Sequence, residues 1–464
     1  MGYHIGFVST RFCGTDGVTL EASKWAQVFE QSGHSCFWFA GKLDRNPQVS
    51  LLAPEAHFLD KQNQWINERV FGKTGRSPYV TEFIHGTRSF LKGQLHRFIE
   101  KFKIDLLIAE NVLTIPLHIP LGLALAEVMA ETEIPTIAHH HDFYWERTRF
   151  SVNAVCDYLQ MAFPPRLPNM QHVVLNSEAQ EQLALRTGIA STIIPNVLDF
   201  ENAPKINGRR ARQFRESIGL KPDDKIILQP TRVVQRKGIE HAIELVKALK
   251  DPRYKIIVTH EAGDEGYEYD EWLKTYAVDR GVDLHMVETK ISAPWSANGD
   301  GKKKYSLWDV YAFADFITYP SLYEGFGNAF LEAVYLKKPI LINRYSTFVR
   351  DIEPLGFKLP VMDGFLSART VQKVKSLLES SPARQEMVDH NFSIASRHFS
   401  FHVLRNKLDL VMRGLLGDEG TCLECISKRY RNIIFFNTEK NLLRGGAHKA
   451  VHSPKANAVE VDAV

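Results

Sequence analysis

Short apolar runs alternate with helix-compatible stretches along most of this chain, and that alternation limits its fold more than any other feature. Each run has the length of a single strand, and the stretch after it is long enough to carry the chain back across a sheet as a helix. In the first half of the chain the runs cover residues 3–8, 35–40, 105–109, 135–139, 172–175 and 192–194. The pattern predicts a mostly parallel, doubly wound α/β sheet.

The same alternation starts again after a polar, basic stretch that extends to about residue 224. Strands are expected over residues 225–231, 254–260, 282–287, 315–319 and 339–343, and helices over 238–249, 270–279, 308–313 and from about Gly327. The first of these helices has its apolar residues at helical spacing on one face. We therefore expect the polar stretch to join two Rossmann-like halves.

Length and composition exclude several classes of protein. A chain of 464 residues is expected to form two or three domains. Its 57 basic and 54 acidic side chains give a net charge of only +3, which is too small for a nucleic-acid-binding surface on a chain of this length. Five cysteines cannot form a dense disulfide framework, and no basic signal segment precedes the first apolar run, so we expect a cytoplasmic location.

The most informative turn covers residues 319–332, where a predicted strand ends and a helix begins. Ligands bind at the carboxyl ends of strands in open α/β sheets, where helix amides face the ligand. Gly325 and Gly327 let the backbone approach a ligand closely. A pyrophosphate on the helix amides would place a sugar toward Glu324, in the loop, and a ribose toward Glu332, about one turn inside the helix. The alternative is a glycine turn with two solvated glutamates.

Two cations follow the first predicted strand of the second half. Arg232 and Lys237 come before the next helix, again at a carboxyl end, and they can neutralise a diphosphate leaving group. On its own such a pair is often a solvated basic loop. No Asp-x-Asp pair occurs in the chain, and the Gly72-Lys73-Thr74 triplet lacks the upstream glycine of a P-loop. We therefore expect the leaving group to be handled without a bound metal.

Taken together, these motifs resemble retaining glycosyltransferases of family 4, which have the GT-B fold. The resemblance covers about residues 3–416 and also includes the loop from Gly14 to Gly17 and the segment 195–199 at the domain junction. It implies two Rossmann-like, doubly wound domains that face each other across a cleft. The expected divisions are an acceptor domain (1–200), a nucleotide-sugar domain (201–395), a helix that crosses back to the first domain (396–416, with its helical core at 399–412) and a partly disordered tail (417–464).

The resemblance also assigns roles to individual residues. Glu324 would contact the transferred sugar and Glu332 the ribose, while Arg232 and Lys237 would bind the diphosphate. The other expected donor-binding residues lie in the two glycine-containing loops: Gly14, Gly17, Gly325, Phe326, Gly327, Asn328 and Ala329.

A histidine beside the donor sugar is a further feature of the family. The candidates lie in the segment His139-His140-His141-Asp142, where His139 and His141 share one face of a strand. His141 is the first choice and His139 the second. Core or surface histidines, or a metal site made by His139, His141 and Asp142, are the alternatives. The expected acceptor-site residues are Asp16, His139, Arg147 and Arg149.

The resemblance implies a metal-independent hexosyltransferase that uses a nucleotide-diphosphate sugar as co-substrate, has no cofactor and retains the anomeric configuration. The alternatives are a phosphorylase or nucleotide-sugar epimerase on the same fold, or a protein that binds a nucleotide sugar without turnover. A lipid acceptor is a further option, because Lys428, Arg429, Arg431, Phe435 and Phe436 give the tail the composition of a weak membrane-docking segment. A solvated tail with a packed Phe pair is the simpler reading. The donor base, the sugar, the acceptor and the oligomeric state are not determined by the sequence.

Overall fold

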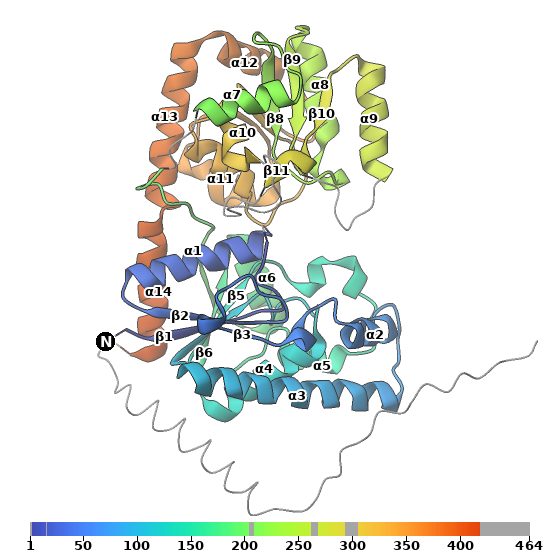
Figure 1. The fold of residues 1–464 in the computed structure, drawn as a ribbon, viewed down its shortest axis with the longest axis vertical. Helices are drawn as coiled ribbons and strands as arrows, with labels where there is room; N and C mark the ends of the chain where they lie inside the picture. The colour runs from blue at the N-terminus through green and yellow to red at the C-terminus, as the bar shows by residue number, and fades with distance from the viewer. Residues whose placement is uncertain (1, 15, 204–207, 261–267, 293–304, 418–464) are drawn as a thin grey trace, which may run out of the picture.

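In the computed structural model, two parallel β-sheets, each covered by helices, lie one above the other (Figure 1). The structure describes residues 2–14, 16–203, 208–260, 268–292 and 305–417. The alternation of strands and helices along the sequence therefore folds as expected, into two Rossmann-like α/β domains.

The first sheet has seven strands in the order β3-β2-β1-β4-β5-β6-β7, all parallel. They are β1 (His4–Val8), β2 (Ser35–Ala40), β3 (Ser50–Leu52), β4 (Leu106–Glu110), β5 (Thr136–His140), β6 (Met170–Val174) and β7 (Ser191–Ile193). The order reverses between β1 and β4, which pair directly. In doubly wound sheets, ligands bind beyond the carboxyl ends of the strands at such a reversal.

Helices α1 (Gly17–Gln31), α2 (Lys61–Val70), α3 (Pro78–Phe102), α4 (Ile119–Thr132), α5 (Cys156–Ala162) and α6 (Ser177–Thr187) belong to the same domain. Polar residues cap the amino ends of several of them. Asp16 accepts a hydrogen bond from the Thr19 amide at the start of α1, and Ser77 precedes a proline in the first turn of α3. These caps fix the point at which each helix leaves its loop.

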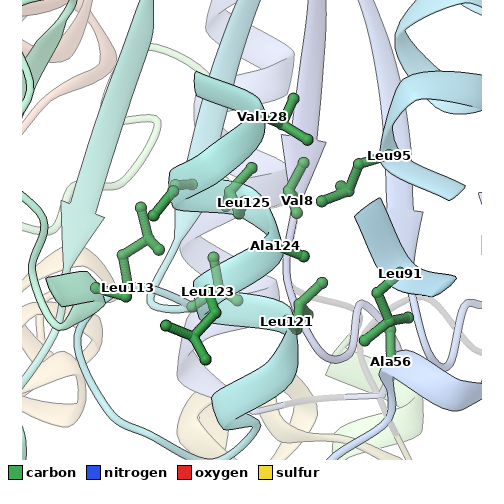
Figure 2. Packing of buried hydrophobic residues seen from close by; sticks show 14 of the residues in the cluster. Val8, Ala56, Leu91, Leu95, Leu113, Leu121, Leu123, Ala124, Leu125 and Val128 are labelled. Atoms are coloured by element: carbon green, nitrogen blue, oxygen red, sulfur yellow. The ribbon is translucent and has the colours of Figure 1, made fainter. Parts of the chain in front are cut away.

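The core between α3, α4 and the sheet is shown in Figure 2. Leu121 and Leu125 of α4 lie near Val8 of β1, with Leu91 and Leu95 of α3 on the other side, and all five side chains are buried. Burial of a side chain of this size contributes about 1.5–3 kcal/mol relative to exposure. This layer therefore holds β1 and β4, whose carboxyl ends carry part of the candidate site.

The second sheet has six parallel strands in the order β10-β9-β8-β13-β14-β15. They are β8 (Lys225–Gln229), β9 (Tyr254–Val258), β10 (Leu284–Met286), β13 (Phe316–Tyr319), β14 (Ile340–Asn343) and β15 (Val361–Met362). Its helices are α7 (Gly208–Ser217), α8 (Ile239–Leu249), α9 (Glu268–Arg280), α10 (Leu307–Phe313), α11 (Asn328–Tyr335) and α12 (Ala368–Glu379). A short parallel pair, β11 (Ile291–Ser292) and β12 (Tyr305–Ser306), stands apart from the sheet.

Two consecutive helices link the domains at the end of the described chain. Helix α13 (Ser381–His398) lies along the second domain, and α14 (Phe401–Leu416) continues beside the first (Figure 1). Phe401, Leu404 and Leu408 of α14 are buried in the same cluster as residues of β1 and α1. The region 399–412, where the sequence suggests a crossing helix, contains most of α14.

Membrane association was expected only through the tail, residues 417–464. Beyond Gly417 these residues lie outside the part of the chain that the structure describes, so that expectation stays a prediction. No helix in the described part has both the length and the apolar composition that a membrane crossing requires.

Candidate active site

Lys237 and Glu324 form a buried ion pair at the carboxyl edge of the second sheet. Lys237 follows β8 and Glu324 follows β13, and the Lys237 Nζ atom contacts the Glu324 Oε1 atom directly. Their side chains are only 10% and 11% exposed. The Arg236 guanidinium lies 3.9 Å from the second carboxylate oxygen. The sequence suggested both residues separately, and the structure places them against each other.

Gly238 explains how the two loops come so close. Its φ of +61° is left-handed, and a Cβ atom at this position would lie 2.7 Å from the Pro320 carbonyl oxygen. The backbone amide of Leu322 also donates to the Arg236 carbonyl, at 2.8 Å. A residue with a side chain at position 238 would therefore push the loop that carries Lys237 away from the loop that carries Glu324.

The electrostatics of this pair favour an ionised carboxylate. Burial alone would raise the pKa of Glu324, but the charge and hydrogen bond of Lys237 outweigh it, and the pKa lies below its usual value. Burial lowers the pKa of Lys237, and the Glu324 carboxylate opposes that effect. Glu324 is therefore a carboxylate at neutral pH, held in place by an ammonium group.

The amino end of α11 lies next to this pair. Gly327, which precedes the helix, has a φ of +113°, and a Cβ atom there would lie 2.4 Å from the Tyr345 hydroxyl oxygen, so only glycine fits. Glu332 lies about one turn inside α11, where its carboxylate accepts a hydrogen bond from the Tyr311 hydroxyl at 2.8 Å. Burial raises the pKa of Glu332. The helix amides and both expected glutamates therefore lie at the same edge of the sheet.

Two further basic residues lie at this edge, Arg232, which was expected, and His260, which was not anticipated from the sequence. Arg232 is partly buried just after β8, close enough to affect the pKa of both Lys237 and His260. His260 follows β9, and burial together with the charges of Lys237 and Arg232 lowers its pKa to about 4. A histidine at the end of the predicted strand over residues 254–260 was the available signal for it. Basic groups from two neighbouring strand ends thus gather where a diphosphate was expected.

The first domain presents a different cluster at its own carboxyl edge. Glu110, the last residue of β4, has no exposed surface, and its carboxylate accepts hydrogen bonds from two imidazoles. The His139 Nδ1 atom lies 3.1 Å from Oε2, and the His141 Nε2 atom lies 2.6 Å from Oε1. The His139 ring stacks on Trp25 of α1, with ring centroids 4.1 Å apart. One buried carboxylate therefore fixes both histidines.

Strand alternation separates the middle histidine from this cluster, as expected. The His140 Nδ1 atom lies 2.6 Å from the Thr114 hydroxyl, and its Nε2 atom lies 2.9 Å from Nδ1 of His172. Burial holds the pKa of His140 well below its usual value. His140 is thus a neutral core residue, whereas His139 and His141 share the opposite face of β5.

The contacts within the Glu110 cluster favour the charged forms of Glu110 and His141. Burial would raise the pKa of Glu110, but His139 and His141 outweigh it and lower the pKa to about 2. Burial would lower the pKa of His141, but the Glu110 carboxylate outweighs that effect and raises it. The ligand atoms of Glu110, His139 and His141 all lie within 4.8 Å of one another, a spacing that a metal ion could also use. Asp142, considered for such a site from the sequence, instead accepts a hydrogen bond from Arg147 Nε at 2.6 Å.

The expected acceptor residues differ in their exposure and in their contacts with the rest of the protein. The Asp16 carboxylate caps α1 and contacts Arg11, 3.1 Å away. Arg147 is exposed and paired with Asp142, and the Arg149 guanidinium lies 4.6 Å from the Phe150 ring centroid. His139 is fully buried beneath His141 and Trp25, so among these residues it has the least access to a ligand.

The two edges meet through the glycine-containing loop of the second domain. The Asn176 Nδ2 atom donates to the Gly325 carbonyl at 2.5 Å, and Asn196 Nδ2 donates to Asn328 Oδ1 at 2.6 Å. A Cβ atom at Gly17, the first residue of α1, would lie 3.8 Å from the Asn328 side chain. The Gly14 amide donates to Asp44 within the first domain. The expected donor-binding loops of the two domains therefore face each other, with Phe326 and Ala329 buried behind them.

Comparisons with known proteins agree with this geometry. Residues 211–392 match the family described as Glycosyl transferases group 1. The mannosylglucosylglycerate synthase of Thermotoga maritima is 32% identical over 425 residues, covering 85% of this chain and 96% of the relative. The mannosylglucosylglycerate synthase of Petrotoga mobilis is 33% identical over 377 residues, covering 76% and 85%.

Solved structures show the same fold at low sequence identity. A glycosyltransferase from Rickettsia africae has a TM-score of 0.64 at 13% identity, covering 90% of this chain and all of that one. HepE from Anabaena, solved with UDP and glucose, has a TM-score of 0.58 at 14% identity, covering 89% and 100%.

The two facing Rossmann-like domains thus have the GT-B fold, and the family match and the relatives make the chain a glycosyltransferase. More particularly, the chain belongs to the family of glycosyl transferases group 1.

Proposed function

We propose that this glycosyltransferase is a retaining member of family 4 that moves a hexose from a nucleotide-diphosphate sugar to a hydroxyl acceptor without a metal ion. The observation that carries the proposal is the meeting of Lys237, Glu324 and the amino end of α11 at one sheet edge, where a Cβ atom at Gly325 would lie 3.5 Å from the His141 carbonyl oxygen. A departing diphosphate requires cations and helix amides, and sugar hydroxyls bind a carboxylate.

In this proposal Arg232 and Lys237 bind the diphosphate, together with the amides from Gly327 to Ala329 and the loop that contains Gly14 and Gly17. The ammonium group of Lys237 has three donors, so it can hold Glu324 and still donate to a phosphate oxygen. Glu332 binds the ribose hydroxyls, exchanging its hydrogen bond from Tyr311 or adding to it.

The reaction proceeds on one face of the sugar. The bond between the anomeric carbon and the phosphate oxygen breaks, its electron pair leaves with the diphosphate, and the acceptor oxygen bonds to the same face. The proton of the acceptor hydroxyl passes to the departing phosphate oxygen. Arg232, Lys237 and the α11 amides stabilise the negative charge that develops on the leaving group, which lowers the barrier. Glu324 orients the sugar and does not attack it.

His141 lies on the other side of the donor sugar in this scheme, and Glu110 is its positioning residue. The Glu110 carboxylate accepts the Nε2–H of His141 at 2.6 Å, which fixes the ring and the position of its proton. Because Glu110 has no exposed surface, it acts through the histidine and does not touch the sugar.

The names of the relatives support a narrower proposal for the substrates. Two relatives that are at least 32% identical are named mannosylglucosylglycerate synthases. We extend the proposal to a mannosyl donor and to glucosylglycerate as acceptor, a sugar that carries a carboxylate.

Ligand binding tests the donor first. UDP, GDP and ADP are compared by thermal shift, since a ligand at about 100 times its Kd stabilises a protein by roughly 2.7 kcal/mol. The mannose conjugate of the nucleotide that stabilises the chain is then incubated with glucosylglycerate, with and without EDTA, and the product is examined by NMR. The proposal expects an α-linked product from an α-linked donor, at a rate that EDTA does not change.

Other outcomes would contradict the proposal. A β-linked product would exclude retention, and loss of transfer with EDTA would exclude metal independence. A requirement for orthophosphate would indicate a phosphorylase, and conversion of the donor without acceptor would indicate an epimerase. Stabilisation by a nucleotide sugar without any release of nucleotide would indicate a protein that only binds it.

A further inference from the structure

Arg11, Lys42 and His57 gather at the carboxyl edge of the first sheet, and none of the functional assignments above uses them. Each follows a different strand, namely β1, β2 and β3. Beyond the strands the backbones of the first two stay paired. The Gly41 amide donates to the Thr10 carbonyl at 3.1 Å, and the Phe12 amide donates to the Lys42 carbonyl at 2.9 Å. Arg11 and Lys42 are therefore held side by side where their strands end.

His57 reaches this pair because Gly41 has no side chain. A Cβ atom at Gly41 would lie 1.9 Å from the His57 backbone nitrogen, so any other residue would force the segment after β3 away. Burial lowers the pKa of His57, and the charges of Arg11 and Lys42 lower it further, which places all three groups within electrostatic reach of one another. Within the described part of the chain, the His57 Nε2 atom is buried without a hydrogen-bond partner.

The carboxylates near the cluster have other hydrogen bonds. Asp16 contacts Arg11 but also caps α1, and Asp60 caps α2 by accepting from the amides of its first turn. Asp44 accepts from the Gly14 amide at 2.9 Å and pairs with Arg45 at 3.1 Å. The charge of these acidic groups is thus shared with backbone amides and a further arginine, and Lys42 stays exposed.

The cluster adjoins the Glu110–His141 pair. Strands β1 and β4 are neighbours in the sheet, and the Ser9 hydroxyl, just beyond β1, donates to the Glu110 carbonyl at 2.9 Å. Arg11 comes two residues after Ser9. An acceptor whose hydroxyl lies near His141 would therefore extend toward Arg11 along the edge of the same sheet.

We propose that Arg11, Lys42 and His57 bind an oxyanion, a carboxylate or a phosphate, at the end of the acceptor remote from the reacting hydroxyl. A guanidinium, an ammonium and a neutral imidazole N–H are complementary to such a group. This assignment rests on the proposed function, and it places acceptor recognition at β1–β3, away from Arg147 and Arg149, which follow β5.

The test compares two acceptors that differ only in the carboxylate, glucosylglycerate and glucosylglycerol, on the full chain. The variants are R11M and K42M, and R97M, on the exposed face of α3, is the matched control. We expect the ratio of kcat/KM for glucosylglycerate to that for glucosylglycerol to fall by about 10- to 100-fold in each of the first two variants, the range for losing a charged hydrogen bond. The R97M variant should keep the wild-type ratio.

A phosphorylated acceptor shows whether the cluster binds a carboxylate or a phosphate. Glucosyl-3-phosphoglycerate is measured in the same variants, and a larger loss for it than for glucosylglycerate would assign the cluster to a phosphate. Equal losses for glucosylglycerate and glucosylglycerol in both R11M and K42M would overturn the assignment, since the residues would then support the fold or the donor.

A binding measurement separates this inference from the proposed function. If the wild-type chain transfers no sugar, glucosylglycerate binding is measured by calorimetry in R11M, K42M and H57Q. Wild-type binding that weakens at least tenfold in these variants, with unchanged Tm, would support the oxyanion site although the transfer proposal had failed. Binding that is equal in wild type and all three variants, or absent from the wild type, would overturn it.

Discussion

The two domains place a buried glutamate at the same topological position but give it different partners. In the second domain Glu324 is held by Lys237, and both side chains keep about a tenth of their surface exposed. In the first domain Glu110 has no exposed surface and is shared by two imidazoles. The comparison shows that the carboxyl edge of the sheet sets the position of the charged groups in both domains. The residue that pairs with the glutamate, a lysine in one domain and histidines in the other, determines whether its charge is permanent or titratable.

Breaking the Lys237–Glu324 pair is expected to have the largest effect. In K237M the Glu324 carboxylate is left buried without its ammonium, which costs about 3–5 kcal/mol of stability, and loss of the leaving-group cation lowers kcat by about 10²- to 10³-fold. Urea unfolding and steady-state transfer assays measure the two effects.

The double variant K237M/E324Q sharpens this test. Removing the buried charge should restore most of the stability but none of the activity, because the pair has one structural and one chemical role. If activity returned with stability, Lys237 and Glu324 would be structural residues alone.

Lowering the pH should destabilise the first domain more than it affects the buried Lys237–Glu324 pair of the second domain. Burial lowers the pKa of His118 and His172 to about 4, below an unfolded value of about 6.5. Their folded forms are neutral, so this contribution is complete above pH 6.5 and is lost as the pH falls toward 4. Between pH 7 and 5 each histidine should reduce the free energy of unfolding by about 2 kcal/mol.

The variant H118N checks that assignment. His118 accepts the Leu121 amide at Nδ1 and caps α4, and asparagine can keep this cap through its amide oxygen without titrating. Urea unfolding at the two pH values should show a smaller loss in H118N than in wild type. An identical loss would mean that other groups carry the acid sensitivity.

Removing the Glu110 charge tests the first-domain side of the comparison. In E110Q the amide can accept only one of the two imidazole N–H groups well, so His141 loses its fixed orientation and kcat should fall by about 10- to 100-fold. The donor KM should change little, because Glu110 touches no donor atom. The E110D variant, which keeps the charge, should recover part of kcat, and a loss that is equal in both variants would indicate packing alone.

The smallest effect is expected at the exposed contact between the domains. Arg350 and Glu181 lie 2.7 Å apart with about half of each side chain exposed. E181Q should therefore cost less than about 1 kcal/mol, and salt should remove the difference. A larger loss in urea unfolding would show that this contact stabilises the domain arrangement more than its exposure suggests.

Much of the fold follows from the sequence because strand length and apolar pattern are local properties. The run at 35–40 coincides with β2, and the face of Ile239, Ala242 and Ile243 is the buried face of α8. The three-residue β3 and the two-residue β15 were not predicted, although β7 and β10, with three residues each, were.

The residues of the candidate site also differ in whether a local pattern in the sequence predicts them. Glu324 and Glu332 were found because a glycine turn marks them in one stretch of sequence. Glu110 appears in the sequence only as an interruption of an apolar run, and its role depends on β4 and β5 being neighbours, which pairs residues 29 and 31 positions apart. The contact between Lys237 and Glu324 spans 87 positions, and no local pattern encodes it. Asp16, expected to bind the acceptor, also caps α1, which no local motif had indicated, and its role in acceptor binding stays a prediction.

Helix α14 has a consequence for how the protein is made. Its apolar side chains complete the cluster that contains Phe7, Trp25 and Trp38, near the other end of the chain. During synthesis, the first domain therefore emerges from the ribosome with one flank uncovered and must wait for the entire second domain to be translated before that flank is closed. A stop codon ahead of residue 401 would leave the earliest-made half of the molecule without its final layer.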